Sequence, residues 1–293
     1  MSITYDMPLY RPPSEGRNLI VQATLGCSFN HCTFCSMYKS KTYQVRSLDR
    51  VCAEIDIMAN SFPQAHRVFL ADGDALALPT DHLVSLLNHL AARFRNLTRV
   101  SSYATPKNLL DKTPEELALL RKMGLKLVYL GIESGANLVL KRVVKGASQK
   151  THAKAIKRAR DAGLKISATV ILGLGGREDW RSHIEGTAEL INIAPPTYLS
   201  TLQLTLEDAS YEAFMESQPE GFRFQDDAGI LAEQKHLISM LNPERQVIFR
   251  SNHASNCLAL AGNLPRDRER LLGEVEAVHS DANLIRPEFL RRL

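Results

Sequence analysis

The stretch GCSFNHCTFC, residues 26–35, holds three of the chain's five cysteines, Cys27, Cys32 and Cys35, in the spacing C-x4-C-x2-C. Clustered thiolates are soft ligands that suit zinc or iron–sulfur centres. A structural zinc site takes four ligands, and a cubane iron–sulfur cluster usually takes four cysteines. Three cysteines therefore predict a centre in which one metal position remains open to another ligand.

The composition around this stretch is that of an ordinary globular protein. The chain has 293 residues, of which 44% are hydrophobic, so one large domain or two small ones can form. No apolar run approaches the roughly 20 residues that a membrane span needs. Residues 1–6 also lack the basic stretch and apolar core of a signal peptide. We therefore expect a cytoplasmic protein that does not enter a membrane.

Charge and cysteine placement exclude two further classes. The net charge is +4, and the basic residues are scattered, as on the predicted helix that carries Lys154, Lys157 and Arg158. This pattern is typical of a solvated helix face, so nucleic acid is not an expected partner. The two cysteines outside the cluster, Cys52 and Cys257, stand alone, and the clustered three indicate metal binding rather than a disulfide framework.

Strands and helices are predicted to alternate over the first two thirds of the chain. The predicted strands are residues 18–24, 67–71, 99–103, 125–130, 164–172 and 197–204. Helices are predicted to begin at Ser47, at Thr80-Asp81 and at Thr113-Pro114, which are typical helix starts, and to cover 148–162 and 180–193. Crossovers of this length join parallel strands.

Six such units predict an α/β fold, a partial (β/α)6 TIM-like barrel with a C-terminal α/β extension. A dinucleotide-binding fold is disfavoured because no Gly-x-Gly-x-x-Gly follows the first strand. The chemistry of a barrel lies at the C-terminal ends of its strands. Four predicted strand ends carry candidates: the cysteine loop, Asp72-Gly73-Asp74, Glu133 and Gly173.

Three regions are expected along the chain. Residues 1–17 form a proline-rich lead-in that wraps the fold, residues 18–205 form the barrel, and residues 206–293 form an extension packed on it. Within the extension, helices are predicted at 211–216, 228–241 and 265–279, and a short strand at 246–250.

At these residues the sequence resembles the radical S-adenosylmethionine (SAM) superfamily, over about residues 18–205. Most members carry C-x3-C-x2-C after the first strand, with an aromatic residue before the third cysteine, where Phe34 stands here. The extra residue between Cys27 and Cys32 departs from that pattern. The resemblance implies that Cys27, Cys32 and Cys35 hold a 4Fe–4S cluster whose fourth iron binds SAM. It further implies reductive cleavage of SAM to a 5′-deoxyadenosyl radical, which abstracts a hydrogen atom from substrate.

The resemblance also implies which residues contact SAM. Asp72-Gly73-Asp74 stands where the family has Gly-Gly-Glu, with Asp72 as the departure. Gly131-Ile132-Glu133-Ser134-Gly135 is similar to a fourth-strand segment of the coproporphyrinogen-dehydrogenase-like and methylthiotransferase-like branches. The predicted SAM contacts are Phe34, Asp72, Gly73, Asp74, Glu133, Ser134, Arg142 (or Lys145), Leu172 and Gly173. The alternatives are a plain turn at Asp72–Asp74, a helix-capping role for Glu133 and a solvated basic turn at Arg142.

The polar stretch after the predicted strand 246–250 is a candidate substrate segment. Arg250 suits a carboxylate or phosphate, and His253 suits acid–base or hydrogen-bond chemistry. The predicted substrate contacts are Gln203, Arg250, Asn252, His253 and Asn256. The alternative is a hydrogen-bonded turn that ties down the extension.

Cysteine counting narrows the reaction. Cys52 and Cys257 are too few to hold an auxiliary cluster, and no cobalamin-sized N-terminal domain is evident, so sulfur insertion and cobalamin-dependent methylation are not expected from this chain. The leading hypothesis is a single-cluster radical SAM enzyme acting on a small molecule, with an electron donor such as flavodoxin or ferredoxin. The alternatives are a cluster- or zinc-binding barrel without SAM cleavage, and a radical SAM enzyme that modifies RNA or protein.

Overall fold

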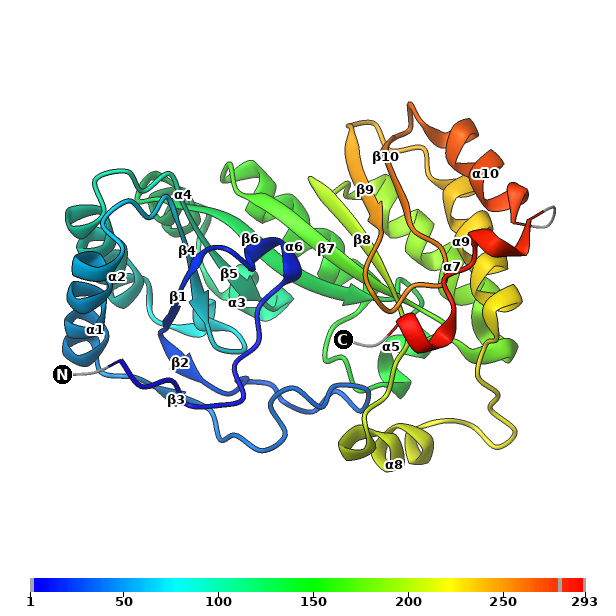
Figure 1. Ribbon diagram of the computed structural model, residues 1–293, viewed down its shortest axis with the longest axis horizontal. Helices are drawn as coiled ribbons and strands as arrows, with labels where there is room; N and C mark the ends of the chain where they lie inside the picture. Colours follow the sequence, from blue (N-terminus) through cyan, green and yellow to red (C-terminus); the bar gives the residue numbers. More distant parts are fainter. Residues whose placement is uncertain (1–2, 279–280, 292–293) are drawn as a thin grey trace. The chain divides into compact units, whose positions relative to one another are not determined.

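The computed structural model describes residues 3–278 and 281–291 (Figure 1). The chain divides into two compact units, and neither is a continuous segment. Unit 1 contains the residues up to Asn30, together with Cys35–Leu130 and Arg158–Ile166. Unit 2 contains His31–Phe34, Gly131–Lys157 and the residues from Ser167 onward.

Unit 1 is built on parallel strands. Strands β1 (Leu19–Gln22), β4 (Arg67–Ala71), β5 (Arg99–Ala104) and the first part of β6 (Leu125–Glu133) pair in that order. A small antiparallel pair, β2 (Thr24–Leu25) and β3 (Gln44–Val45), brackets the cysteine loop. The helices are α1 (Leu48–Ser61), α2 (Thr80–Arg93), α3 (Pro106–Asp111) and α4 (Pro114–Lys122), with single turns η1 (Pro13–Glu15) and η2 (Ala75–Ala77). Figure 1 shows α1 and α2 side by side.

Local chemistry explains where these helices begin. The Ser47 side chain accepts from the backbone of Arg50 ahead of α1, and α4 begins at Pro114, both as predicted. Thr113 and Glu116 also form a capping box ahead of α4, which was not predicted. Helix α2 begins at Thr80, as predicted, but neither Thr80 nor Asp81 caps it. Thr80 is already the first helical residue, and the residue before it is Pro79, which has no side-chain donor or acceptor to act as a cap.

The lead-in of unit 1 is fastened by a buried carboxylate. Glu15 is fully buried and accepts hydrogen bonds from Arg99 (2.7 Å), from the Ser101 hydroxyl (3.0 Å) and from the Tyr129 hydroxyl (2.5 Å). Arg99 and Ser101 lie on β5 and Tyr129 lies on β6. A charge removed from water needs such partners, so the lead-in belongs to the core of unit 1.

Unit 2 continues the alternation. It holds the end of β6, α5 (Asn137–Arg142), most of β7 (Lys165–Leu172), α7 (Gly176–Ile193), β8 (Tyr198–Gln203), α8 (Asp208–Ser217), α9 (Asp227–Met240), β9 (Val247–Ser251), β10 (Leu260–Leu264), α10 (Arg268–Ala277) and the turns η3 (Ala282–Leu284) and η4 (Glu288–Leu290). Helix α6 (Gln149–Asp161) has residues in both units. Strands β7, β8 and β9 pair in parallel, and β10 pairs with β9 in antiparallel.

The two faces of β7–β10 differ in burial. One cross-strand row consists of Ala168, Leu199, Phe249 and Gly262, all of them buried. A Cβ on Gly262 would lie 3.0 Å from Leu271, so α10 covers this face closely. The next row lies on the opposite face and consists of Thr169, Ser200, Arg250 and Ala261, which are half-buried or exposed. Period-two alternation thus gives one packed face and one open face.

The predicted α/β class and the mostly parallel sheet are confirmed. Several details differ. The strand predicted at 18–24 is divided into β1 and β2, and α7 begins at Gly176 rather than Trp180. The helix predicted at 265–279 is α10, which runs from Arg268 to Ala277, and residue 279 lies outside the described residues. Helices α3 and α5 and strand β10 were not predicted.

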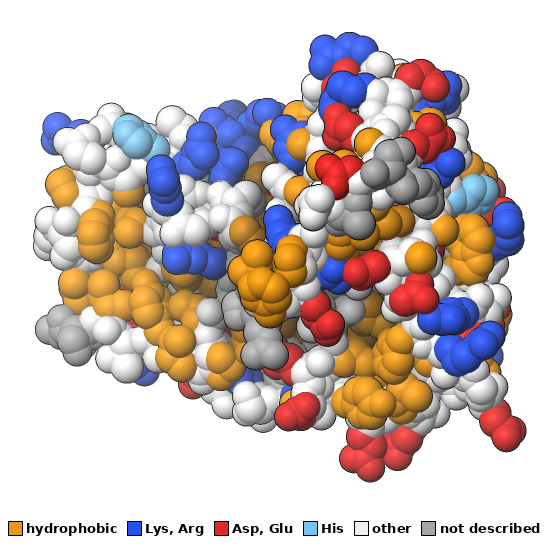
Figure 2. Space-filling view, turned by 45° about the vertical axis from the view of Figure 1, so that its right-hand side comes forward, with side chains coloured by type: hydrophobic (Ala, Val, Ile, Leu, Met, Phe, Trp, Pro, Cys, Tyr) orange, Lys and Arg blue, Asp and Glu red, His pale blue; other side chains and the backbone are white. Residues whose placement is uncertain are grey.

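The surface agrees with the scattered charge of the sequence. Over α10, basic and acidic side chains are interspersed (Figure 2), and pairs such as Arg270–Glu274 and Arg266–Asp267 link them. Within residues 3–278 and 281–291, none of the helices has the length and apolar character required to cross a membrane.

Candidate functional site

The cysteine loop contributes to both units. Cys27 and Cys35 belong to unit 1, whereas Cys32 and Phe34 belong to the short segment His31–Phe34 of unit 2. All three thiols are half-buried, and no disulfide includes them. Among the described residues, no three Cys, His, Asp or Glu side chains stand in a ready ligating arrangement.

The unit 2 part of the loop is held by α5 and α8. The backbone of Thr33 donates to Val143 (3.1 Å), and its hydroxyl bonds the Ser217 hydroxyl (3.2 Å). Phe34 packs against a buried cluster that includes Val139 and Phe214. The aromatic residue before the third cysteine is therefore part of the packing of unit 2.

The unit 1 part of the loop lies against the turn that follows β4. A Cβ on Gly73 would lie 2.4 Å from the Gly26 oxygen and 2.6 Å from the Cys27 Cα, so only glycine fits there. The Asp74 carboxylate accepts from the backbone N–H of Ser28 (2.9 Å) and from its hydroxyl. The residues on either side of Cys27 are thus held by the predicted Asp72-Gly73-Asp74 segment.

Asp72 hydrogen-bonds residues at the start of the same loop and just after it. This buried carboxylate accepts from Lys41 Nζ (2.9 Å), the Gln22 amide (3.2 Å) and the Gly26 N–H (3.4 Å). Burial alone would lower the pKa of Lys41, but its bonds with Asp72 and Asp6 outweigh burial and raise it. Lys41 therefore stays charged and compensates the buried acid.

Burial and hydrogen bonding act in opposite directions on Asp74. Burial raises the pKa of Asp74, and hydrogen bonds from Ser28 and Asn108 partly offset that rise. The neighbouring Tyr38 ring is buried, and burial together with the nearby Asp72 charge raises the pKa of its hydroxyl. Tyr38 therefore remains neutral beside the loop.

In unit 2, Glu133 ends β6 in a left-handed conformation (φ 59°) and pairs with Lys145 at 2.9 Å. A Cβ on Gly131 would overlap the Glu133 carboxylate at 1.9 Å, so glycine opens the space for this pair. Arg142 pairs instead with Asp179 (2.7 Å), and its Nη1 is buried without a hydrogen-bond partner. The structure thus brings Glu133 to Lys145 rather than to Arg142.

Ser134 is fixed by a buried histidine of α7. His183 lies between the Ser134 hydroxyl (2.8 Å) and the Ile171 oxygen (3.0 Å). Burial lowers the pKa of His183 to about 4. Because a carbonyl oxygen can only accept, neutral His183 donates a hydrogen bond from Nε2 to the Ile171 oxygen and accepts one at Nδ1 from the Ser134 hydroxyl. The ends of β6 and β7 are thereby joined within unit 2.

The glycine after β7 is held by a buried acid of α9. Gly173 (φ 82°) donates its N–H to Glu233 at 2.7 Å, and Gln225 donates to the other carboxylate oxygen at 3.1 Å. Glu233 is fully buried, and burial raises its pKa to about 7. Leu172, the preceding residue, is buried in the core.

The predicted substrate residues fall into two groups. Asn256 is buried, accepts from the Gln203 N–H (2.8 Å) and donates to Thr201 (2.7 Å) and Ser251 (2.8 Å), so its amide and Gln203 join β8 to the loop after β9. Arg250, Asn252 and His253 remain exposed or half-buried. Burial, and then the charge of Arg286, lowers the pKa of His253.

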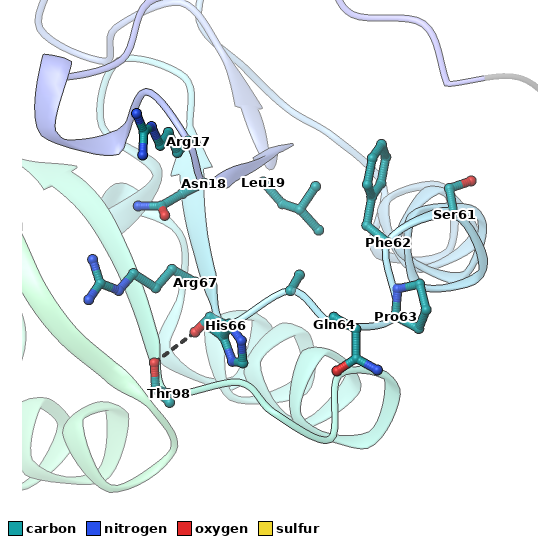
Figure 3. A pocket seen from close by; sticks show the side chains of 11 residues that line it. Arg17, Asn18, Leu19, Ser61, Phe62, Pro63, Gln64, His66, Arg67 and Thr98 are labelled. Atoms are coloured by element: carbon teal, nitrogen blue, oxygen red, sulfur yellow. Dashed lines mark hydrogen bonds between the residues drawn. The ribbon is translucent and has the colours of Figure 1, made fainter.

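A cavity of about 770 Å³ lies elsewhere in unit 1. Its lining includes Arg17 and Leu19 at the beginning of β1, Arg67 at the beginning of β4, and Phe62 just after α1 (Figure 3). The cysteine loop and Asp72 follow the other ends of these strands. None of the predicted site residues lines this cavity.

Sequence reasoning missed four residues that hold the candidate site: Ser28, Lys41, His183 and Glu233. Each acts on a partner distant in sequence, for example Lys41 on Asp72 and Glu233 on Gly173. The available signal for His183 and Glu233 was their helical spacing from apolar residues, since His183 lies seven residues before Leu190 and Glu233 lies between Ile230 and Leu237, and buried polar groups need partners.

Comparison with known proteins gives a consistent family. The family model described as the radical SAM superfamily matches residues 21–191. An anaerobic magnesium-protoporphyrin IX monomethyl ester cyclase of Rubrivivax gelatinosus is 30% identical over 171 residues, which are 55% of this chain and 28% of the relative. The curated relatives that this chain matches are longer than it is, and the matched segments span 28–39% of the length of those relatives.

Solved structures agree in fold. Coproporphyrinogen III oxidase from Escherichia coli, described as a radical SAM enzyme, gives a TM-score of 0.57 at 16% identity, covering 76% of this chain and 51% of that one. Methylornithine synthase gives a TM-score of 0.54 at 12% identity, covering 88% and 68%. Identities this low speak for the fold alone, which is the partial barrel expected from the sequence.

The residues present fit the cofactors of that family. The loop has three thiols and no fourth cysteine, which suits a 4Fe–4S cluster with one open iron. Because Gly73 has no side chain, the backbone of Cys27 can lie close to the turn after β4. The family match covers more than half of the chain. This protein is therefore an enzyme of the radical SAM superfamily, whose members use a 4Fe–4S cluster and SAM.

Proposed function

We propose that the chain cleaves SAM reductively and abstracts a hydrogen atom from a small-molecule substrate, with Cys27, Cys32 and Cys35 as the cluster ligands. When bound, the cluster would supply the electron that breaks the C5′–S bond of SAM, which gives methionine and a 5′-deoxyadenosyl radical. That electron comes from a donor such as flavodoxin or ferredoxin. The observation that carries the proposal is the close approach of Gly73 to the Cys27 backbone, together with the hydrogen bond from the Ser28 N–H to Asp74.

The proposed SAM contacts lie at strand ends whose backbone is fixed. Asp72, Gly73 and Asp74 follow β4. Glu133 ends β6 and Ser134 follows it, and Leu172 ends β7 and Gly173 follows it. Each group has partners that restrict its movement, as described above. Pre-positioned backbone and carboxylate groups orient a cofactor without a further ordering cost. The unpartnered Nη1 of Arg142 is a donor available for a carboxylate.

Reconstitution under anaerobic conditions tests the proposal. The protein is loaded with iron and sulfide, then supplied with SAM and a chemical reductant, and 5′-deoxyadenosine is measured. We expect its formation by the wild type and its loss in Cys27→Ser. Cys52→Ser is the matched control, because Cys52 lies on α1 outside the cysteine loop. It should retain the cluster and 5′-deoxyadenosine formation.

Two results would contradict the proposal. A wild-type protein with a full cluster and no 5′-deoxyadenosine would favour a cluster-binding barrel that does not cleave SAM. One zinc per chain and no iron would instead remove the cluster assignment. Loss of the cluster in Cys52→Ser to the same degree as in Cys27→Ser would show that the assay does not report on the loop.

A further inference from the structure

The open face of β7–β10 carries polar groups in register. Thr169 on β7, Ser200 on β8 and Arg250 on β9 are direct cross-strand partners. Neighbouring residues in one row of a sheet project to the same side. Ser167, which is buried, and Tyr198, which is half-buried, form the adjacent row on the same side.

These groups are not needed to hold unit 2 together. Within the described part of the chain, the hydroxyls of Thr169 and Ser200 have no protein hydrogen-bond partner. Both residues are half-buried, whereas the row behind them is fully buried. Apolar β-branched residues would suit a strand better if packing were the only requirement. The polar row is therefore available to a ligand.

In the part of the chain that the structure describes, Arg250 lacks the carboxylate partner that several arginines of unit 2 have. Arg142, Arg177 and Arg291 each pair with an aspartate at 2.6–2.8 Å. Arg250 has no carboxylate partner among the described residues. Its Nη1 donates to the carbonyls of Phe249 (2.7 Å) and Gly262 (3.4 Å), which leaves its other N–H groups to point elsewhere.

One anchored guanidinium beside hydroxyl groups is a combination that recognises an anion. Guanidinium binds carboxylate and phosphate through paired N–H groups, and the hydroxyls can donate to or accept from the rest of the ligand. Among the described residues of β7–β10 on this face, the charged ones are Arg250 and Lys165, which begins β7 two residues before Ser167, and both are basic. A cationic ligand would find no counter-charge there.

We infer that the open face of β7–β10 binds an organic anion, with Arg250 on its carboxylate or phosphate and Ser200 and Thr169 on its polar groups. This inference rests on the proposed function, because it names the class of the small-molecule substrate. It extends the Arg250 hypothesis to two residues that the sequence did not indicate.

Binding of matched small probes tests the inference without SAM turnover. Glycerol phosphate, glycerate and glycerol share a hydroxylated carbon chain and differ in their charged group. Their affinities for the reconstituted protein are measured by ligand-observed NMR. We expect binding of one or both anions and weaker binding of glycerol, and the stronger anion identifies phosphate or carboxylate as the recognised group.

Variants locate the site. Arg250→Gln should weaken binding of the anion by about 10- to 100-fold, the usual value of hydrogen bonds to charged groups. Arg250→Lys should restore part of the affinity, and Ser200→Ala should weaken it less. Arg245→Gln is the control, because Arg245 is an exposed arginine just before β9. If Arg250→Gln unfolds, Ser200→Ala and Thr169→Val carry the test.

The outcomes separate this inference from the proposed function. Equal affinity of wild type and Arg250→Gln, equal affinity for glycerol and both anions, or no binding of either anion would overturn the inference. Failure of the wild type to form 5′-deoxyadenosine would overturn the proposed function and would leave anion binding at Arg250 intact.

Discussion

Replacing Gly73 with alanine is expected to displace the cysteine loop. The added Cβ would lie 2.4 Å from the Gly26 oxygen, 2.6 Å from the Cys27 Cα and 2.8 Å from the Cys27 Cβ. The first contact is about 1 Å shorter than a favourable separation of about 3.5 Å. All three atoms belong to the loop and two are backbone, so a side-chain rotation cannot relieve the overlap. Overpacking of this kind costs about 1–3 kcal/mol.

The assay follows cluster loading and stability together. Gly73→Ala should bind clearly less iron and sulfide per chain than the wild type after anaerobic reconstitution, and the protein should unfold at lower urea concentration. Gly273→Ala is the matched control, because its Cβ would meet nothing within 4 Å in α10. The control should gain up to about 1 kcal/mol from helix propensity. Full iron content and unchanged stability in Gly73→Ala would refute the close-contact reasoning.

Three further changes test the surroundings of the site. Lys41→Met should lower the free energy of unfolding in urea by about 3 kcal/mol, because it leaves Asp72 buried without a counter-charge. Adding Asp72→Asn should recover part of that loss, and no recovery would argue against the Lys41–Asp72 pair. Asp74→Ala should destabilise by about 1–3 kcal/mol and lower the iron content, since the N–H of Ser28 loses its acceptor; wild-type iron content would contradict this role. The raised pKa of Glu233, about 7 against 4.5 when unfolded, means that the folded state keeps a proton that the unfolded chain has released. Stability should therefore fall by about 3 kcal/mol as the pH rises from about 4.5 to 7 relative to Glu233→Gln, and parallel pH profiles of the two proteins in urea unfolding would exclude this assignment.

Local signals in the sequence predicted the fold well where one segment decides its own structure. The strand at 67–71 and the helix start at Thr113-Pro114 depend on neighbours within a few residues, and both are confirmed. Helix α3 was missed although Thr105-Pro106 carries the same signal as Thr113-Pro114, because its six residues are too few for a periodic pattern. Strand β10 contains Gly262 and Asn263, which have low strand propensity, and it forms because β9 offers an open edge.

The sequence predicted the positions of the candidate site residues but not the residues that hold them in place. Strand ends could be read from the alternation of elements, which directed attention to Gly73 and Gly173. The hydrogen-bond partners of those positions could not be predicted, because contacts such as Glu233 with Gly173 join residues 60 positions apart. Physical complementarity across such a distance leaves no periodic trace in a single sequence. The register that aligns Ser200 with Arg250 depends likewise on how two strands pair.

The Glu15 carboxylate lies outside the segment that matches the family model, although its partners lie inside that segment. The matched segment begins at residue 21, so a fragment cut to that boundary would omit Glu15. Arg99, Ser101 and Tyr129 would then each lose an acceptor inside the sheet. The segment that matches the family is therefore shorter than the segment needed for a satisfied core. Glu15 lies before the matched segment, yet it bonds residues of β5 and β6 that lie more than 80 positions after it.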